Sequence, residues 1–202
     1  MSTVRLSAAA ALVSSFLISA VPALSQALPG LPPLRTAPEL SFKLPGGEKR
    51  ELSHYKGKVV ALEFIQTTCP HCQEAAKVMS TLQRELGPKG FQALDVAVNT
   101  TDEALIKQFI LDQRVVFPVG WIDAGSPRDN VMVLMNFMGM TASDRPQVPQ
   151  QVLIDREGMI RYQTPPSGDA TALEESTLRG RLLEILGQAG APRPKPPAAQ
   201  SK

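Results

Sequence analysis

The chain contains two cysteines, and only two residues separate them in the segment Cys69-Pro70-His71-Cys72. The segment follows the apolar run 59–65, broken only by Glu63, which has the length and composition of a strand buried on both faces. Proline is favoured at the first position of a helix, so Pro70 predicts that a helix begins there. Both thiols therefore lie where a central strand passes into a helix, and most of the functional prediction depends on this site.

The predicted helix start places Cys69 at the N-cap and Cys72 at the third helical position. An N-cap side chain accepts hydrogen bonds from first-turn N–H groups, and the helix dipole adds positive potential, so both effects are expected to favour a Cys69 thiolate. Cys72 is expected to be the less exposed, resolving thiol. A protonated His71 would stabilise the same thiolate. The alternative is an exposed His71 without a role.

A structural disulfide and a metal site are the alternatives for the cysteine pair. A disulfide here would close so small a loop that it would remove little entropy from the unfolded chain. A structural zinc site needs four ligands, and His54 and His71 are the two histidines of the chain. The spacing therefore favours a redox-active Cys69–Cys72 disulfide, and we expect no metal and no cofactor.

The N-terminal residues have the pattern of a secretory signal. Arg5 precedes an apolar stretch over residues 6–24, and small residues favour cleavage after Ser25. An uncleaved membrane anchor is the alternative, which Pro22 and four serines in the stretch disfavour. Either case predicts a periplasmic or secreted domain, where disulfides persist, with membrane contact only if the signal is uncleaved.

Four segments are expected: a signal peptide over 1–25, a proline-rich linker over 26–38, one folded domain over 39–188 and a disordered Pro/Ala-rich tail over 189–202. The formal net charge is +2 and there is no run of lysine or arginine, which disfavours a nucleic-acid partner.

Strands and helices alternate along the predicted domain, which indicates an α/β fold with a parallel sheet core. A first hairpin is expected near 40–52, and a second flanks the turn 155–158. Helices are expected from Pro70 to the Gly87-Pro88 stop, after a Thr100/Glu103 capping box and over 171–186, and further strands over 91–98 and 115–122. In the first two helices the expected core-facing residues are Ala75, Met79, Leu82, Leu86, Leu105, Ile106, Phe109 and Ile110.

These motifs together resemble the thioredoxin superfamily, in particular its extracytoplasmic TlpA/ResA-type thiol-disulfide oxidoreductases. The matching segments span roughly 37–163. They are Ala37-Pro38, the sequence 52–60, Phe64, the cysteine motif, Phe117-Pro118-Val119, Val148-Pro149 and the sequence 153–158. The resemblance implies a thioredoxin-like three-layer sandwich, with a central mixed β-sheet and an N-terminal β-hairpin extension.

The resemblance also implies roles for three residues outside the cysteine motif. Pro149 matches the cis-proline that faces the disulfide, and the backbone of Val148 would pair with a substrate peptide. Glu63 matches a buried carboxylate that accepts the proton of Cys72, although a carboxylate reaching solvent at a strand edge is the alternative. An ordinary trans proline is the alternative for Pro149.

The function expected is disulfide exchange with cysteine pairs of protein substrates, with a partner thiol protein that resets the dithiol. A Sco-like copper chaperone and a peroxiredoxin-like peroxidase are the alternatives. The first would have wider cysteine spacing and a distal histidine, and the second would need other residues at Leu62 and Gln66. Thr68 stands where the family usually has tryptophan, and Pro70-His71 is the dipeptide of DsbA-type oxidases, so the direction of electron flow stays open.

The segment 123–147 is longer than usual for the family, and four methionines crowd its centre. A helix packed against the core is favoured, with a soft copper site or pliable binding surface as the alternatives. The residues concerned are Val131, Met132, Leu134, Met135, Phe137, Met138 and Met140.

Overall fold

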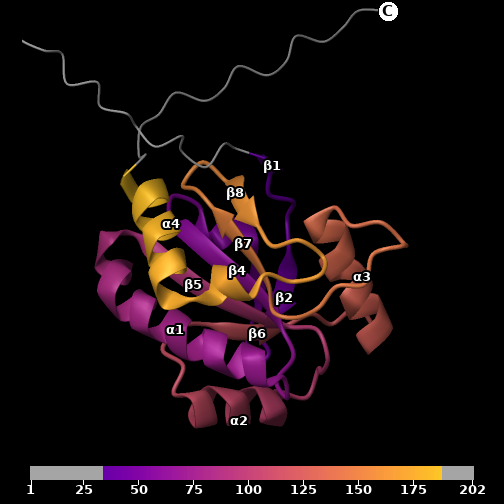
Figure 1. Cartoon of the computed structure of the whole chain (residues 1–202). Helices are drawn as coiled ribbons and strands as arrows, with labels where there is room; N and C mark the ends of the chain where they lie inside the picture. Colours follow the sequence, from indigo (N-terminus) through magenta and orange to yellow (C-terminus); the bar gives the residue numbers. More distant parts are fainter. Residues whose placement is uncertain (1–33, 188–202) are drawn as a thin grey trace, which may run out of the picture.

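The computed structural model describes residues 34–187, which form one mixed sheet covered by helices on both faces (Figure 1). The strand order across the sheet is β1-β8-β7-β4-β5-β6-β2-β3. The strands are β1 (Arg35–Thr36), β2 (Ser41–Lys43), β3 (Lys49–Glu51), β4 (Val59–Ile65), β5 (Phe91–Ala97), β6 (Val119–Trp121), β7 (Gln150–Ile154) and β8 (Met159–Gln163). The α-helices are α1 (Pro70–Leu86), α2 (Glu103–Gln113), α3 (Pro127–Met138) and α4 (Glu175–Gly187), and short 3-10 turns cover Leu52–Tyr55, Gly87–Lys89 and Ala170–Leu173.

The centre of the sheet is the pair β4 and β5, which run parallel in register from Val59↔Phe91 to Ile65↔Ala97. Every residue of both strands is buried, as the unbroken apolar run predicts for strands with both faces covered. β7 pairs antiparallel with β4, and β6 continues the parallel set beyond β5. The predicted mixed α/β sheet is confirmed.

The predicted N-terminal hairpin is β2 and β3, which extends the sheet beyond β6. Leu40, Phe42 and Leu44 are buried and Ser41 is exposed, in agreement with the alternation of apolar residues. Gly120 of β6 lies against this hairpin so closely that an added Cβ atom would stand 2.4 Å from the Lys43 carbonyl oxygen.

Alternate residues of β4 contribute to two separate hydrophobic clusters. Val59, Ala61 and Ile65 pack with side chains of α1, α2 and α4, whereas Leu62 and Phe64 pack with α3. Figure 1 shows α3 on the other side of the sheet from α1 and α4. The three layers of the thioredoxin-like sandwich follow from this alternation, since successive side chains of a strand point to opposite faces.

Helix α1 begins and ends where the sequence predicts. Pro70 occupies the first turn, and Gly87 follows the last residue. The predicted apolar stripe is buried in full, and Cys72 joins it one turn earlier; its members are Cys72, Ala75, Met79, Leu82 and Leu86. The helix therefore carries the second cysteine into the core by the same periodicity that buries its apolar face.

The start of helix α2 differs from the prediction. The N-cap is Asp102, whose side chain accepts a hydrogen bond from the Ala104 amide, so the Thr100/Glu103 capping box is wrong. Thr100 instead accepts a hydrogen bond from the Asp102 amide. The expected core-facing position of Leu105 is wrong: 47% of this residue is exposed, because the helix packs on the face that carries Ile106 and Phe109.

Three further boundaries are shifted. The predicted strand 115–122 contains only β6, because Pro118 lacks an amide for the ladder. The predicted helix 171–186 is divided by Glu174, whose backbone is extended, into a 3-10 turn and α4. The linker prediction is wrong at its end, since Arg35 and Thr36 pair with Ile160 and Met159 as strand β1.

The methionine-rich segment forms α3, which packs against the core as favoured. Met135 and Met138 are buried beside Phe137, whose ring contacts Phe64 edge-on with centroids 5.4 Å apart. Met132 is 44% exposed. The signal peptide, the linker over 26–33 and the tail lie outside the described residues.

Candidate functional site

The two cysteines lie at the N-terminus of α1, where the sequence places them. The carbonyl of Cys69 accepts the first helical hydrogen bond, from the Gln73 amide at 3.1 Å, so Cys69 is the N-cap. Both cysteines are free thiols. Cys69 is half-buried and Cys72 is fully buried, which confirms the expected difference in exposure. The accessible sulfur is therefore that of Cys69.

The predicted partner of the Cys69 sulfur is wrong. No first-turn N–H group donates to the side chain. Instead, the thiol donates to the Val148 carbonyl oxygen, with 3.7 Å between sulfur and oxygen. A thiol is a donor, and the Val148 carbonyl in the loop before β7 supplies its acceptor. The Cys69 side chain thus faces this loop.

The peptide bond between Val148 and Pro149 is cis, as the resemblance implies. Pro149 directly precedes β7, which pairs with β4 through Phe64↔Gln150, so this pairing holds the loop at the end of β4 that leads to the cysteines. Two segments about eighty residues apart in sequence therefore meet at the Cys69 sulfur.

Side-chain hydrogen bonds hold the loop between β4 and α1. The Thr67 amide donates to Asn99 Oδ1, and Asn99 Nδ2 donates to Thr67 Oγ1, both at 3.2 Å. Gln73 Nε2 donates to the Thr67 carbonyl at 3.1 Å. Thr67 is thus bonded both to the residues after β5 and to the first turn of α1. These bonds hold the loop that leads from β4 to Cys69 in place.

Burial raises the pKa of the Cys72 thiol, a backbone hydrogen bond at Gln66 opposes the rise, and Cys69 and then Glu63 add smaller contributions that raise it further. Cys72 is therefore a thiol that ionises only with a proton acceptor nearby. Glu63 lies on the face of β4 that α1 covers, between Ala61 and Ile65, and its charge adds to the raised pKa of Cys72.

Glu63 is fully buried in the middle of β4, so the alternative of a solvent-reaching carboxylate is excluded. Gln151 Nε2, from the adjacent β7, donates to Glu63 Oε1 at 2.7 Å. Burial raises the pKa of Glu63 to about 7, and the Gln151 hydrogen bond opposes this rise. A carboxyl group that titrates near neutral pH can both accept and return a proton under ordinary conditions.

The sequence analysis missed a second buried carboxyl group. Asp95 of β5 is the register partner of Glu63 and is fully buried. Burial, with the nearby Glu63 charge, raises the pKa of Asp95 well above its ordinary value. The signal was present in the sequence, because Asp95 interrupts an apolar strand in the same way as Glu63.

A groove of about 360 Å³ adjoins the cysteine motif. Its walls come from the first turns of α1, the cis-proline loop and the segment 167–174. The residues that matter for its chemistry are His71, Glu74, Val148, Pro149, Asp169 and Glu174. His71 is exposed at its edge, and its effect on the thiols remains a prediction.

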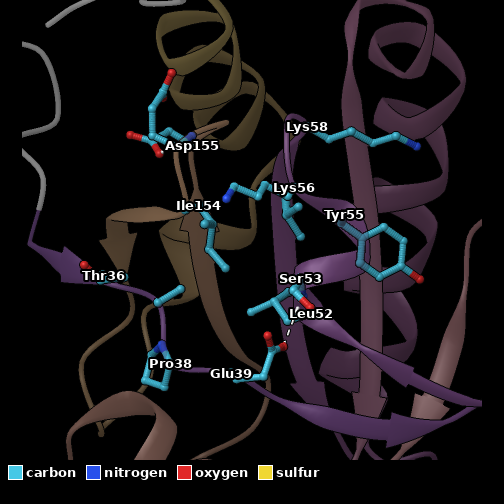
Figure 2. A pocket seen from close by; sticks show the side chains of 14 residues that line it. Thr36, Pro38, Glu39, Leu52, Ser53, Tyr55, Lys56, Lys58, Ile154 and Asp155 are labelled. Atoms are coloured by element: carbon cyan, nitrogen blue, oxygen red, sulfur yellow. Dashed lines mark hydrogen bonds between the residues drawn. The ribbon is translucent and has the colours of Figure 1, made fainter. Parts of the chain in front are cut away.

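A smaller cavity of about 150 Å³ lies at the other end of β4, where Val60 pairs with Ile154 (Figure 2). Glu39 lies beside it, and its carboxylate accepts hydrogen bonds from the Leu40 and Ser53 amides. Glu39 therefore joins the segment before β2 to the 3-10 turn Leu52–Tyr55.

Within residues 34–187 no helix has the length and apolar character needed to cross a bilayer. In the same range no three His, Cys, Asp or Glu side chains converge as metal ligands would.

The fold and site are those of a thioredoxin-like redox enzyme, and comparison with known proteins agrees. The chain is 29% identical over 129 residues to "Thiol-disulfide oxidoreductase ResA" of Bacillus thuringiensis subsp. konkukian, a match that covers 64% of this chain and 67% of that protein. Residues 33–163 match the model of the AhpC/TSA family. The chain belongs to this family.

Solved structures show the same fold. A thioredoxin family thiol:disulfide interchange protein from Chlorobium tepidum superposes with a TM-score of 0.60 at 20% identity, over 77% of this chain and 98% of that one. A secreted disulfide oxidoreductase of Mycobacterium tuberculosis, described as homologous to DsbE of E. coli, superposes with a TM-score of 0.53 at 16% identity, over 71% and 94%.

Proposed function

We propose that the protein exchanges disulfides with cysteine pairs of protein substrates through Cys69 and Cys72. The observation that carries the proposal is the asymmetry of the two thiols at one helix N-terminus. The Cys69 sulfur is accessible and faces the cis-proline loop, whereas Cys72 is fully buried on the side of the sheet that also carries Glu63. Attack by one thiol and resolution by the other require this difference.

In the first step, the Cys69 thiolate attacks one sulfur of a substrate disulfide. A Cys69–substrate disulfide forms, and the second substrate sulfur leaves as a thiolate that takes up a proton. In the second step, Cys72 gives its proton to Glu63 and attacks Cys69, and the first substrate sulfur leaves. Two electrons pass from the protein dithiol to the substrate, and the reverse sequence oxidises a substrate dithiol.

The groove beside the cysteines supports a polypeptide substrate. Val148 and Pro149 form one wall within reach of the Cys69 sulfur, so an extended segment placed there would present its own sulfur to Cys69. The Val148 backbone would pair with that segment, as strand-adding peptides pair with a sheet edge. Pro70 sets the helix start, and His71 at the groove edge would favour the thiolate.

We also propose that the domain acts outside the cytoplasm, as a periplasmic or secreted protein. The signal pattern over 1–25, with a linker after it and a tail over 189–202, supports this organisation. A secreted relative of the same fold agrees with it. In such a compartment, a partner thiol protein would restore the dithiol or the disulfide after each cycle.

The test is reduction of insulin disulfides by dithiothreitol, with wild type, Cys69→Ser and Cys72→Ser compared. Cys69→Ser is expected to lower the catalysed rate by at least about a hundredfold, about 3 kcal/mol in the barrier, because the attacking sulfur is lost. In the absence of dithiothreitol, reduced Cys72→Ser is expected to accumulate a covalent complex with insulin, which added dithiothreitol then releases. Equal activity in wild type and Cys69→Ser would contradict the proposal.

A further inference from the structure

Three polar side chains form a row across the centre of the sheet, on the face that α1 covers. Parallel pairing of β4 with β5 sets Asp95 beside Glu63, and antiparallel pairing of β4 with β7 sets Gln151 on the other side. All three side chains are fully buried. Neighbouring strands lie about 4.8 Å apart, so side chains paired in register on one face are in reach of each other.

The hydrogen bonds in this row are incomplete. Gln151 supplies a donor to Glu63 Oε1, but Glu63 Oε2 and both carboxyl oxygens of Asp95 have no donor among the described residues. Each buried oxygen without a hydrogen-bond partner lowers the stability of the fold by about 1–3 kcal/mol, so a cluster of three needs a physical explanation. Two carboxyl groups can satisfy one another only when one of them carries a proton.

The surroundings do not favour two negative charges. On this face, α1 contributes Cys72, and α2 and α4 contribute apolar side chains such as Ile106 and Leu182. The charged group that acts on Asp95 is Glu63, and Glu63 acts in turn on Cys72. Two adjacent carboxylates in such a medium repel strongly, so one of them retains its proton.

We propose that Asp95 is a positioning residue for the proton acceptor: it keeps its proton at neutral pH and donates it in a hydrogen bond to Glu63 Oε2. Glu63 then carries the single negative charge of the pair, held by Gln151 on one oxygen and Asp95 on the other. In the resolving step the Cys72 proton passes to Glu63, and the Cys72 thiolate attacks Cys69. This assignment rests on the proposed function and adds Asp95 to it.

In the experiment, reduced protein is mixed with dithionitrobenzoate. The absorbance of the coloured thiolate is followed, and one equivalent is released in each of two steps. Attack by Cys69 gives the first release, and resolution by Cys72 gives the second. The rate of the second release is measured against pH in wild type, Asp95→Leu and Asp95→Asn. Leucine removes the donor, whereas asparagine retains one at nearly the same size.

Asp95→Leu is expected to raise the midpoint of the second-release profile by about one pH unit, which slows that step up to about tenfold below the midpoint. Asp95→Asn is expected to restore the midpoint to within a few tenths of a unit. The first release stays unchanged in both variants. Gln92→Leu is the matched control, because Gln92 lies on the same strand and is buried but bonds to Lys58 instead.

Infrared difference spectroscopy gives a second readout that needs only wild type and Asp95→Asn. At about one pH unit above the Glu63 midpoint, wild type is expected to show the carbonyl stretch of a protonated carboxyl group, and Asp95→Asn is expected to lose it. Absence of this band in wild type, a downward midpoint shift in Asp95→Asn or an unshifted Asp95→Leu would each overturn the assignment of Asp95. A wild type that gives no second release would instead contradict the proposed function.

Discussion

Glu63 shows how burial changes the chemistry of a single residue. Its side chain lies in the middle of the central strand, and the loss of hydration raises its pKa from the ordinary 4.5 to about 7. A group with such a pKa exchanges protons near neutral pH, which an exposed glutamate cannot do efficiently. The same burial has a thermodynamic cost, because the ionised form is disfavoured in the folded state.

The free energy of unfolding should therefore depend on pH in a defined window. As pH rises above about 4.5, the unfolded chain releases the Glu63 proton first, so the folded chain binds more protons until about pH 7. The contribution of Glu63 to stability is expected to be fully present below this window and to fall across it by about 3 kcal/mol. Asp95, whose pKa is also raised by burial, adds to this fall. Urea unfolding at several pH values measures the slope.

Glu63→Gln should make this slope shallower, because the Glu63 proton no longer contributes to it, while the contribution of Asp95 stays. Glu157→Gln, at an exposed turn residue, is the control and should retain the wild-type slope. An unchanged slope in Glu63→Gln would show that another group causes the pH dependence.

The contact between β6 and the N-terminal hairpin depends on the absence of a side chain. At Gly120, a Cβ atom would lie 2.4 Å from the Lys43 carbonyl and 2.7 Å from the Phe42 ring. A backbone carbonyl in a paired strand cannot move aside without breaking the pairing of Lys43 with Trp121. The close packing of β6 against β2 of the hairpin therefore requires glycine at position 120.

Gly120→Ala is therefore expected to lower the free energy of unfolding by about 1–3 kcal/mol, as overpacking does elsewhere. Gly180→Ala is the matched control, since Gly180 lies inside α4 with no atom near the position of its Cβ. It should increase stability by about 0.5–1 kcal/mol, because alanine orders a helix at a lower entropic cost. Thermal or urea unfolding of both variants distinguishes these signs, and equal effects would refute the explanation.

The two faces of the sheet carry different kinds of residues. The dithiol, Glu63 and Asp95 lie on the face covered by α1, α2 and α4, while α3 packs on the opposite face. Arg35 joins distant segments on that second face, donating to the Phe137 carbonyl at the end of α3 and to Gln163 of β8. A change in the α3 layer should therefore alter stability without altering the thiol chemistry.

Phe137→Ala tests this separation. Loss of a buried ring in contact with Phe64 is expected to cost about 3–5 kcal/mol of stability. The rate of the first release from dithionitrobenzoate should stay within twofold of wild type while the protein is folded. Met132→Ala, at a residue exposed on the same helix, should change stability by less than about 0.5 kcal/mol. A large rate change in Phe137→Ala would show that the two layers are coupled.

The sequence by itself determined the features that arise from local pattern. Apolar runs defined the central strands, and Pro70 defined the start of α1, because strand periodicity and proline geometry act over a few residues. Resemblance to known motifs added the cis Val148–Pro149 bond and the buried Glu63, and the structure confirms both features. The Thr100/Glu103 capping box failed because several residues near a helix start can cap it, and tertiary packing selects one of them.

Only the tertiary structure decided which distant residues meet. Strand register places Asp95 and Gln151 on either side of Glu63, and no local pattern specifies register between strands separated by a helix. The thiol of Cys69 faces Val148 rather than its own helix because the cis-proline loop is held beside it by the pairing of β7 with β4. In the proposed mechanism the cysteine motif supplies the reacting atoms, and the assembled sheet sets Glu63 and the groove around them.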